Sequence, residues 1–294
     1  MAVRTGALAL ALAAFACGRS RAAGPSRSVA SIAGDGAGQH AVVTARSGKV
    51  ELLRANDGSV SEARVGDQLG VRDAVRTEEG DADLAFDGVR LRLHDASQLT
   101  VEELHRQKMR ARVRGSLESD VAENASLDVE AEGGDAVAHS DGGHFFITSD
   151  GHGIVAVATV TGSVHLAGSG ESVEVAKGQV SRVSRTQPTP SQPAAALRRV
   201  LLSVQWPNQK ETNRATLPIV GRVEPGSRVF VQGVPVAVEP GGTFHAEVPL
   251  RQGRQKIAVV TVDALGRRRQ VESVVVRDDS APDIKVKKKL WQWR

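Results

Sequence analysis

The sequence predicts an all-β protein in which a β-sandwich or roll is followed by an immunoglobulin-like β-sandwich. Apolar residues alternate with polar ones through much of the chain, and this period of two places one set of side chains on a buried strand face. The alternating runs are short and are separated by glycine-containing turns, which is typical of antiparallel sandwiches. Aromatic residues make up 3% of the 294 residues and tyrosine is absent. The core must therefore consist of aliphatic side chains, whose β-branched members favour strands.

The strongest local signal is a hairpin centred on Asp87-Gly88. Alternation runs from 82 to 86 before this pair and from 89 to 93 after it, and both turn residues accept the positive φ of a tight hairpin. Leu99 and Val101 continue the pattern. Further strands are predicted at Ala41–Ala45, Lys49–Arg54, Phe145–Thr148, Ile154–Thr159, Ser163–Leu166 and Ser172–Ala176, with turns at Ser47-Gly48, Asp57-Gly58, Thr161-Gly162 and Lys177-Gly178.

The alternation resumes after a stretch that contains Pro188, Pro190 and Pro193. Proline restricts the backbone, so this stretch predicts a stiff linker. About seven strands over ~90 residues without cysteines then indicate an immunoglobulin-like sandwich. The clearest of these strands are Val229–Val231, Val234–Val238, Phe244–Val248, Ile257–Val262 and Val271–Val276.

Composition and charge divide the chain into segments. The predicted segments are a signal peptide over 1–17, a flexible tether over 18–39, a first domain over 40–185, a linker over 186–197 and a second domain over 198–294. Residues 40–185 hold 16 Lys and Arg against 24 Asp and Glu, a net charge of −8, whereas residues 186–294 hold 18 against 9, a net charge of +9. Either the two halves attract, or the second faces an anionic partner. No nucleic-acid-binding motif accompanies this charge, so nucleic acid is not an expected partner.

The first seventeen residues indicate export. Arg4 supplies a positive charge, and residues 7–16 form an uninterrupted apolar run that ends at Cys17. Ten residues are too few to span a ~30 Å hydrocarbon core as a helix, but they match the apolar part of a signal peptide. Ala14-Phe15-Ala16-Cys17 resembles a bacterial lipobox, in which acyl chains on the cysteine hold the protein on the membrane. Ala14-x-Ala16 also fits an ordinary cleavage site, which would leave a soluble protein.

No later segment reaches 18 apolar residues, so we expect no transmembrane helix. Cys17 is the single cysteine of the chain, which excludes an intramolecular disulfide.

Several short motifs run through the first domain. They are Ser47-Gly48-Lys49-Val50, Val65-Gly66-Asp67-Gln68-Leu69, Asp73-Ala74-Val75-Arg76-Thr77, Leu84-Ala85-Phe86-Asp87-Gly88, Ser97-Gln98-Leu99 and, later, Val173-Glu174-Val175 with Lys177-Gly178-Gln179. At these residues the chain resembles a FecR domain, although 102–143 is highly polar and hard to align. The resemblance implies a periplasmic β module of the kind found in a sensor that relays a transport signal to a sigma factor. We find neither the cytoplasmic arm nor the membrane helix of that sensor, so the resemblance implies partner binding rather than sigma-factor regulation.

The second domain has a motif series of its own. It consists of the run 217–229, followed by Val231-Gln232-Gly233-Val234-Pro235-Val236, Gly242-Thr243-Phe244, Val248-Pro249-Leu250 and Asp263-Ala264-Leu265-Gly266. This series resembles bacterial immunoglobulin-like repeats of the glucodextranase B-domain kind. Such domains are appended to enzymes and surface proteins as non-catalytic spacers or adhesive modules.

Three other groups of residues are candidate sites. His139, His144 and His152 with Asp141 could suit zinc, but their spacing matches no metal motif and we expect no metal. The run 102–114 forms either a basic patch or, as we favour, a solvated strand or helix face. The tail from Lys285 to Arg294 either docks on anionic lipid or, as we favour, forms a terminal strand that packs Trp291 and Trp293 on one face.

The sequence contains no G-x-S-x-G, Walker A, H-E-x-x-H or C-x-x-C motif. We therefore predict no catalytic residue and no cofactor, and Cys17 as a lipidation site. The expected function is that of a cell-envelope lipoprotein, in the periplasm or on the outer membrane, that binds a protein or glycan partner without catalysis. The alternatives are a periplasmic signal-transduction protein of the FecR type and a carbohydrate-active enzyme, which needs two suitably placed carboxylates.

Overall fold

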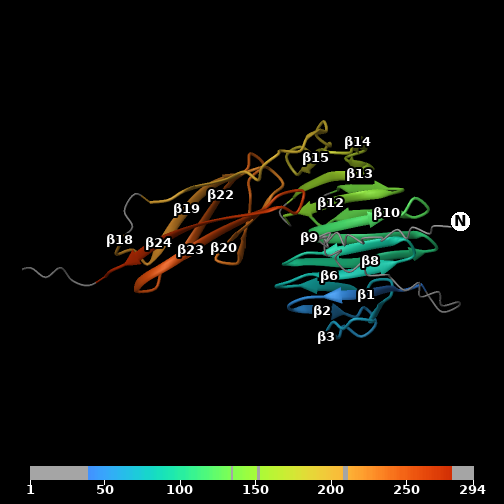
Figure 1. Cartoon of the computed structure of the whole chain (residues 1–294), viewed down its shortest axis with the longest axis horizontal. Helices are drawn as coiled ribbons and strands as arrows, with labels where there is room; N and C mark the ends of the chain where they lie inside the picture. The colour runs from blue at the N-terminus through green and yellow to red at the C-terminus, as the bar shows by residue number, and fades with distance from the viewer. Residues whose placement is uncertain (1–38, 134, 151–152, 208–210, 280–294) are drawn as a thin grey trace, which may run out of the picture. The chain divides into compact units, whose positions relative to one another are not determined.

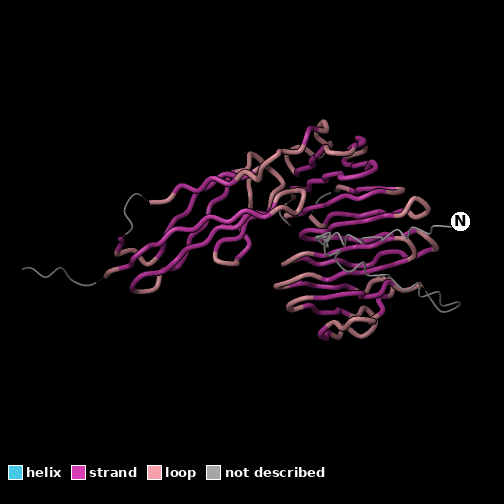
Figure 2. The backbone as a smooth tube through the Cα atoms, viewed as in Figure 1, coloured by secondary structure: helices cyan, strands magenta, loops and turns pink. Residues whose placement is uncertain are grey.

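The computed structural model describes residues 39–133, 135–150, 153–207 and 211–279, whose regular structure is β-strand throughout (Figure 2). This confirms the predicted all-β class. Residues 38–294 group into one compact unit. Within the described ranges no helix is long and apolar enough to cross a membrane. Cys17 and the rest of the predicted signal peptide, the tether up to residue 38, His152 and the basic tail lie outside the described residues.

The first sixteen strands of the described chain form one β-sandwich, in which most strands lie side by side (Figure 1). They are β1 (Ala41–Arg46), β2 (Val50–Leu53), β3 (Val60–Glu62), β4 (Gln68–Leu69), β5 (Ala74–Thr77), β6 (Ala82–Phe86), β7 (Val89–Leu93), β8 (Ser97–His105), β9 (Lys108–Val121), β10 (Ser126–Ala131), β11 (Val137–Ser140), β12 (Gly143–Ser149), β13 (Ile154–Gly168), β14 (Glu171–Ala176), β15 (Gln179–Ser184) and β16 (Ala194–Ala195).

These strands make two sheets that share two long strands. Sheet A runs β4-β1-β6-β7-β9-β12-β13-β15-β16. Sheet B runs β3-β2-β5-β8-β9-β10-β11-β13-β14, with one parallel pair, β9 and β10. One hydrophobic core joins inward side chains of both sheets, such as Val43 and Leu84 of sheet A and Leu52 and Val101 of sheet B. The two sheets are therefore the layers of a single sandwich.

Strands β9 and β13 each pass from one sheet to the other at a glycine. β9 pairs within sheet B up to Arg114 and within sheet A from Gly115 onward. β13 pairs within sheet A up to Gly162 and within sheet B beyond it. Gly115 has a φ of +105° and Gly162 a φ of +74°, values that favour glycine and let a strand turn a corner between sheets. The predicted turn between two separate strands at Thr161-Gly162 is wrong, because the chain stays paired on both sides of the bend.

The predicted hairpin at Asp87-Gly88 is confirmed. Strands β6 and β7 pair around it, and both turn residues have positive φ, +31° and +90°. Along β7 the valine and leucines are buried, whereas Arg90 and Arg92 point outward. The polar segment 102–143, in which the sequence predicts only a solvated strand or helix face over 102–114, holds the end of β8 and all of β9, β10 and β11.

The second sandwich follows residue 201 and consists of two further sheets. Its strands are β17 (Leu202–Gln205), β18 (Glu211–Thr212), β19 (Thr216–Val223), β20 (Arg228–Val231), β21 (Val234–Val236), β22 (Thr243–Pro249), β23 (Gly253–Val262) and β24 (Arg268–Arg277). A three-stranded sheet runs β17-β19-β22 and a five-stranded sheet β18-β24-β23-β20-β21, with β18 parallel to β24. In immunoglobulin lettering, β17 and β18 are strands A and A′, β19 is B, β20 and β21 are C and C′, and β22, β23 and β24 are E, F and G. The two sheets are then A-B-E and A′-G-F-C-C′, which is an immunoglobulin-like arrangement. Its core centres on Phe244, Ile219 and Ile257.

The segment between the sandwiches is attached to sheet A. Ala194 of β16 pairs with Val180 of β15, the Ser191 amide donates to Arg182 O at 2.8 Å, and the Ala196 amide donates to Gly178 O at 3.0 Å. This segment, which the prolines predicted to be a stiff linker, thus follows the edge of the first sandwich.

Candidate functional site

The turn between β19 and β20 packs against sheet A of the first sandwich. The Thr148 hydroxyl donates to Gly226 O at 2.9 Å, and Arg182 Nε donates to Pro225 O at 2.6 Å. The Arg182 guanidinium also forms an ion pair with Glu224. A small apolar cluster closes the same contact. Its buried members are Ala156, Ala158, Val180 and Ala264. These contacts place the first residue of β20 beside the first sandwich.

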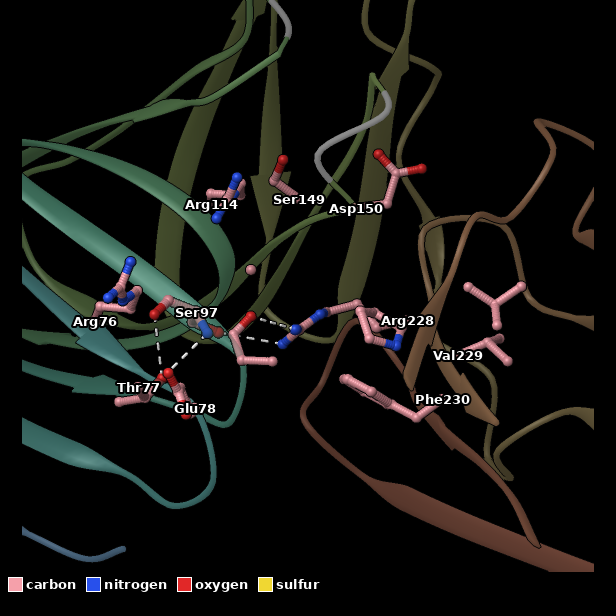
Figure 3. A pocket seen from close by; sticks show the side chains of 14 residues that line it. Arg76, Thr77, Glu78, Ser97, Arg114, Ser149, Asp150, Arg228, Val229 and Phe230 are labelled. Atoms are coloured by element: carbon pink, nitrogen blue, oxygen red, sulfur yellow. Dashed lines mark hydrogen bonds between the residues drawn. The ribbon is translucent and has the colours of Figure 1, made fainter. Parts of the chain in front are cut away.

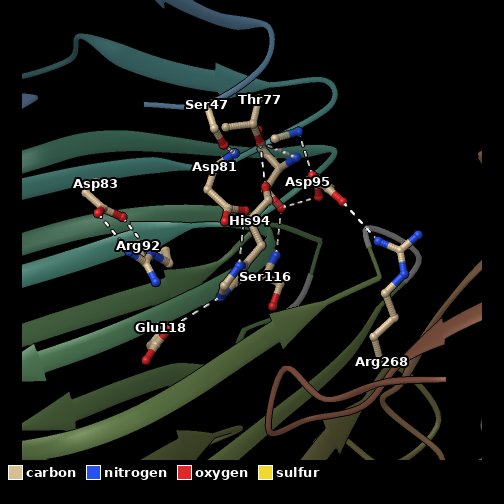
Figure 4. Close-up of polar contacts among 12 residues, drawn as sticks. Ser47, Thr77, Asp81, Asp83, Arg92, His94, Asp95, Ser116, Glu118 and Arg268 are labelled. Atoms are coloured by element: carbon tan, nitrogen blue, oxygen red, sulfur yellow. Dashed lines mark hydrogen bonds and ion pairs between the residues drawn. The ribbon is translucent and has the colours of Figure 1, made fainter. Parts of the chain in front are cut away.

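The neighbouring part of the first sandwich is the β7–β8 turn, residues 94–97. The Gly80 amide donates to Asp95 Oδ1 at 2.6 Å, and the Thr77 hydroxyl donates to His94 O at 2.5 Å (Figure 4). Ala96 has a φ of +47°, a left-handed conformation that is uncommon for alanine and needs support from its surroundings. These bonds hold the backbone carbonyls of the turn in fixed directions.

Arg228, the first residue of β20, binds to this turn. Nη1 donates to Asp95 O at 2.9 Å and to Ser97 Oγ at 3.2 Å, and Nη2 donates to Ala96 O at 2.6 Å. The guanidinium carbon lies 5.0 Å from the ring centroid of Phe230, within the range of a cation–π contact. The residue is 8% exposed, so a cationic side chain is almost fully buried between the sandwiches.

A cavity of about 480 Å³ opens beside Arg228. Arg76, Arg114 and Arg228 surround it (Figure 3). Its polar lining also includes Thr77, Glu78, Ser97, Ser149 and Asp150, and its apolar lining Ala96, Val229, Phe230, Pro235 and Val236. We refer to this cavity as the Arg228 cleft.

The three arginines of the Arg228 cleft differ in their partners. Arg76 is neutralised by Glu51, with Nη2 and Oε2 2.5 Å apart. Arg114, which is exposed, forms no side-chain hydrogen bond or ion pair with any described residue. Arg228 likewise forms no ion pair within the described chain. The carboxylate of Asp95 acts on Arg228 electrostatically. Its ion pair is with Arg268, where Asp95 Oδ2 lies 3.7 Å from Nη1. Burial lowers the pKa of Arg228 to about 10, Asp95 opposes this shift, and Arg114 adds to it.

At this pKa Arg228 stays protonated at neutral pH. The cleft therefore presents two guanidinium groups that form no ion pair with a described residue, next to an apolar wall, and the carboxylates of Glu78 and Asp150 line the same cavity. Guanidinium groups recognise carboxylates and phosphates through paired hydrogen bonds. The arrangement is suited to holding a charged ligand.

Comparison with known proteins assigns no family. No protein-family model and no curated protein matches the chain. Two crystal structures of a candidate anti-sigma factor from Parabacteroides distasonis ATCC 8503 align with TM-scores of 0.36 at 15% and 16% identity. Each alignment covers 42% of this chain and 59% of the other, so this chain spans little more than half of that protein. A polysaccharide lyase aligns with a TM-score of 0.21 at 11% identity, over 82% of this chain and 40% of the lyase. Similarity at this level carries no functional argument.

The histidines considered for zinc do not come together in the described structure. His139 lies on β11 in sheet B, with Nδ1 2.6 Å from Asp128 and Nε2 3.2 Å from Asp141. His144 lies on β12 in sheet A, where Nε2 is 2.9 Å from Glu118. Each described imidazole thus has its own carboxylate partner, and no group of three or more metal-binding side chains is arranged around one point within the described ranges.

The run 102–114 forms a solvated strand face rather than a basic patch. It covers the end of β8 and the first half of β9. Arg110 pairs with Glu103 at 3.8 Å and with Glu130 at 3.5 Å, and Arg112 pairs with Glu102 at 3.3 Å. Acidic residues of neighbouring strands neutralise these arginines, which leaves Arg114 as the cation of β9 without such a partner.

We expect the pKa of His139 to lie above its usual value. Burial lowers this pKa, but the hydrogen bonds that the imidazole donates to the carboxylates of Asp128 and Asp141 outweigh burial and raise it. The stabilisation from this contact should be complete below pH ~6.5 and should be lost as the pH rises through the raised pKa. NMR titration of the imidazole measures the shift. Asp128→Asn should reduce it and Asp57→Asn, in a distant turn, should not; a wild-type His139 titrating at or below the ordinary value would contradict the expectation.

Sequence reasoning did not single out Arg228. In the alternation of β20, Val229 and Val231 face the core, which assigns Arg228 and Phe230 to the outer face. An arginine on an outer face is normally solvated. Its burial comes from the other sandwich, and a contact of that kind leaves no periodic signal in the sequence.

Proposed function

We propose that this protein is an exported, non-catalytic protein of a bacterial cell envelope, lipid-anchored through Cys17, that binds a protein or glycan partner. The observation that carries the binding role is the Arg228 cleft, in which two guanidinium groups that form no ion pair with a described residue stand beside an apolar wall. A pocket with an apolar lining and a few directed polar groups is the common form of a binding site. Export and anchoring rest on the leader pattern that ends at Cys17.

The FecR-like and glucodextranase B-like resemblances support the same proposal. Both belong to modules that bind or space other components of the envelope. The two sandwiches with their short loops provide a rigid scaffold for such a site, because loops and pockets on β-sandwiches are positioned by the strands beneath them.

Fractionation of bacteria that express the full chain tests export and anchoring. We expect wild-type protein in the membrane fraction, labelled by a radioactive fatty acid, and Cys17→Ser protein without the label. Because two acyl chains are needed for stable anchoring, the variant should lose membrane retention. Processed wild-type protein that is soluble and unlabelled would reject the anchor and support ordinary cleavage after Ala16, whereas unprocessed protein in the cytosol would overturn the proposal.

The binding role is tested by affinity capture from intact envelopes with the anchored full chain. A protein or glycan enriched by wild type, and reduced when Arg114 is changed to Gln, supports the proposal. Equal recovery by both proteins would show that the cleft is not the binding site. Release of sugars from a glycan panel would instead favour a carbohydrate-active enzyme.

A further inference from the structure

The geometry points to an oxyanion-binding subsite in the Arg228 cleft, formed by the free edge of the Arg228 guanidinium and by the Arg114 side chain. This inference rests on the proposed binding function and specifies the chemistry of the ligand: a carboxylate or phosphate group attached to a body of about sugar size. Four features of the described residues lead to it.

The first feature is the hydrogen-bond inventory of Arg228. A guanidinium has five N–H donors, and three of them bind Asp95 O, Ser97 Oγ and Ala96 O. Both hydrogens of Nη1 are used, and one of Nη2. Nε–H and one hydrogen of Nη2 have no partner among the described residues. Nε and Nη2 share one edge of the planar group, and we infer that this edge is the one that binds a carboxylate or phosphate through two parallel hydrogen bonds.

The second feature is that this edge is held in place before any ligand arrives. Three hydrogen bonds to a fixed turn, together with the Phe230 ring at 5.0 Å, restrict the rotamers of Arg228. An arginine on a free surface loses side-chain entropy when it binds. Here that cost has been met by folding, so binding a ligand should restrict Arg228 little further.

The third feature is Arg114, which lines the same cavity from β9. Its guanidinium is close enough to Arg228 to act on it electrostatically. Two like charges that share a cavity repel each other, and an anion placed between them would relieve this repulsion. Arg112, two residues earlier on the same strand, shows the usual alternative, because its charge is balanced by Glu102 and Glu130.

The fourth feature is the charge of the two halves. If the two halves simply attracted each other, acidic side chains of residues 40–185 should form ion pairs with basic side chains of residues 198–279. Among the described ion pairs, only Asp95 with Arg268 has this direction, and Arg182 with Glu224 has the opposite one. Ion pairs between the two halves therefore do not neutralise the excess positive charge of residues 198–279.

The size and wall of the cleft limit the ligand further. A volume of about 480 Å³ lies within the range of ~300–1,000 Å³ that is usual for small-molecule pockets, so an inorganic anion alone would leave most of the cavity unfilled. Phe230 and Val236 provide apolar surface in the lining of the same cavity. A sugar acid or sugar phosphate, free or at the end of a polymer, offers both an oxyanion and a ring that can pack on that surface.

Calorimetric titration of the full chain carrying Cys17→Ser, which removes the lipid, tests the proposal with four probes. Galacturonate and glucose 1-phosphate carry the anion; galactose and glucose are their neutral counterparts. We expect each anionic probe to bind at least tenfold more tightly than its neutral counterpart, with an affinity that falls as salt is added because the charges are partly screened. The stronger of the two anionic probes distinguishes a carboxylate ligand from a phosphate ligand.

Three variants locate the site. Arg114→Gln should weaken binding of the anionic probes at least tenfold without changing thermal stability, because this side chain forms no hydrogen bond or ion pair with a described residue. Arg228→Lys keeps the charge but removes the two-donor edge, and should weaken binding by a similar factor. Arg112→Gln is the matched control and should leave binding unchanged.

Equal affinity for anionic and neutral probes, or no binding of any probe, would overturn the inference. So would a loss for Arg112→Gln as large as that for Arg114→Gln. A different pair of results would reject the proposed function but keep this subsite. In that case the purified protein would bind anionic probes through Arg114, and fractionation would find the protein outside the envelope. Capture of an envelope partner that does not depend on Arg114, together with absent probe binding, would leave the function and reject this subsite.

Discussion

Gly115→Ala is expected to lower the free energy of unfolding of the first sandwich by about 3 kcal/mol or more. Gly115 has a φ of +105° at the point where β9 passes from sheet B to sheet A. An alanine there would be strained by ~1–3 kcal/mol. Its Cβ would also overlap Ser97 Oγ and lie 2.7 Å from Ser97 Cα, and crowding in a packed interior costs ~1–3 kcal/mol more. Denaturant unfolding, followed by a probe in the first sandwich, measures the loss.

Gly178→Ala is the matched control for this prediction. Gly178 also belongs to the first sandwich and has a positive φ of +77°, but no atom lies within 4 Å of the position that its Cβ would take. It should therefore lose only the ~1–2 kcal/mol of the left-handed backbone. If Gly115→Ala cost no more than Gly178→Ala, the close approach of β9 to Ser97 would be wrong.

The strands of the first sandwich could be predicted from sequence, but their distribution over two sheets could not. Met109, Ala111 and Val113 are inward on β9 before Gly115, and Leu117 and Val121 are inward after it. The period of two keeps its phase across the bend. Alternation therefore indicates one long strand and contains no information about the change of partners, which depends on hydrogen bonds to distant segments.

The same limit explains the outcome for β13. Its first six residues, Ile154 to Thr159, are all buried, as in a strand covered on both faces, and the sequence predicted a strand there. Gly162 then resembled a turn, because glycine with positive φ is common in turns. Whether such a glycine ends a strand or bends it depends on whether a partner continues beyond it, and here β14 and β11 do.

The Arg228 cleft was beyond sequence reasoning for a related reason. The pattern of β20 distinguishes the core face from the outer face, but it cannot say that the outer face meets another sandwich. Histidines are candidate zinc ligands by residue type, but His139 and His144 lie in different sheets. The hydrogen bonds of Arg228 and the lining of its cavity indicate the site, and both require atomic positions.

Phe244→Ala is expected to destabilise the second sandwich by about 3–5 kcal/mol, the usual range for a buried phenylalanine. Phe244 is fully buried at the centre of that core. Its ring covers Gly221, the residue opposite it on β19, so closely that a Cβ on Gly221 would overlap the ring and lie 2.7 Å from Ser203 O. Removing the ring would leave a cavity that Gly221 cannot fill. Gly221→Ala should destabilise the same sandwich through overlap rather than loss of contact.

Calorimetry of Phe244→Ala and of Phe145→Ala, its buried counterpart in the first sandwich, also tests the predicted domains. If 40–185 and 198–294 fold as separate domains, each substitution should lower the melting temperature of one transition and leave the other in place. For the second domain, of ~100 residues, the shift should be at least ~12 °C, at ~4 °C per kcal/mol, and for the first, of ~150 residues, at least ~6 °C, at ~2 °C per kcal/mol. The contacts of Arg182, Thr148 and Arg228 join the two sandwiches and oppose their independent unfolding. If one sandwich unfolded alone, these buried hydrogen bonds would have to be replaced by hydrogen bonds to water. A single transition that both substitutions shift equally would reject separate domains and show that these contacts make the sandwiches one cooperative unit.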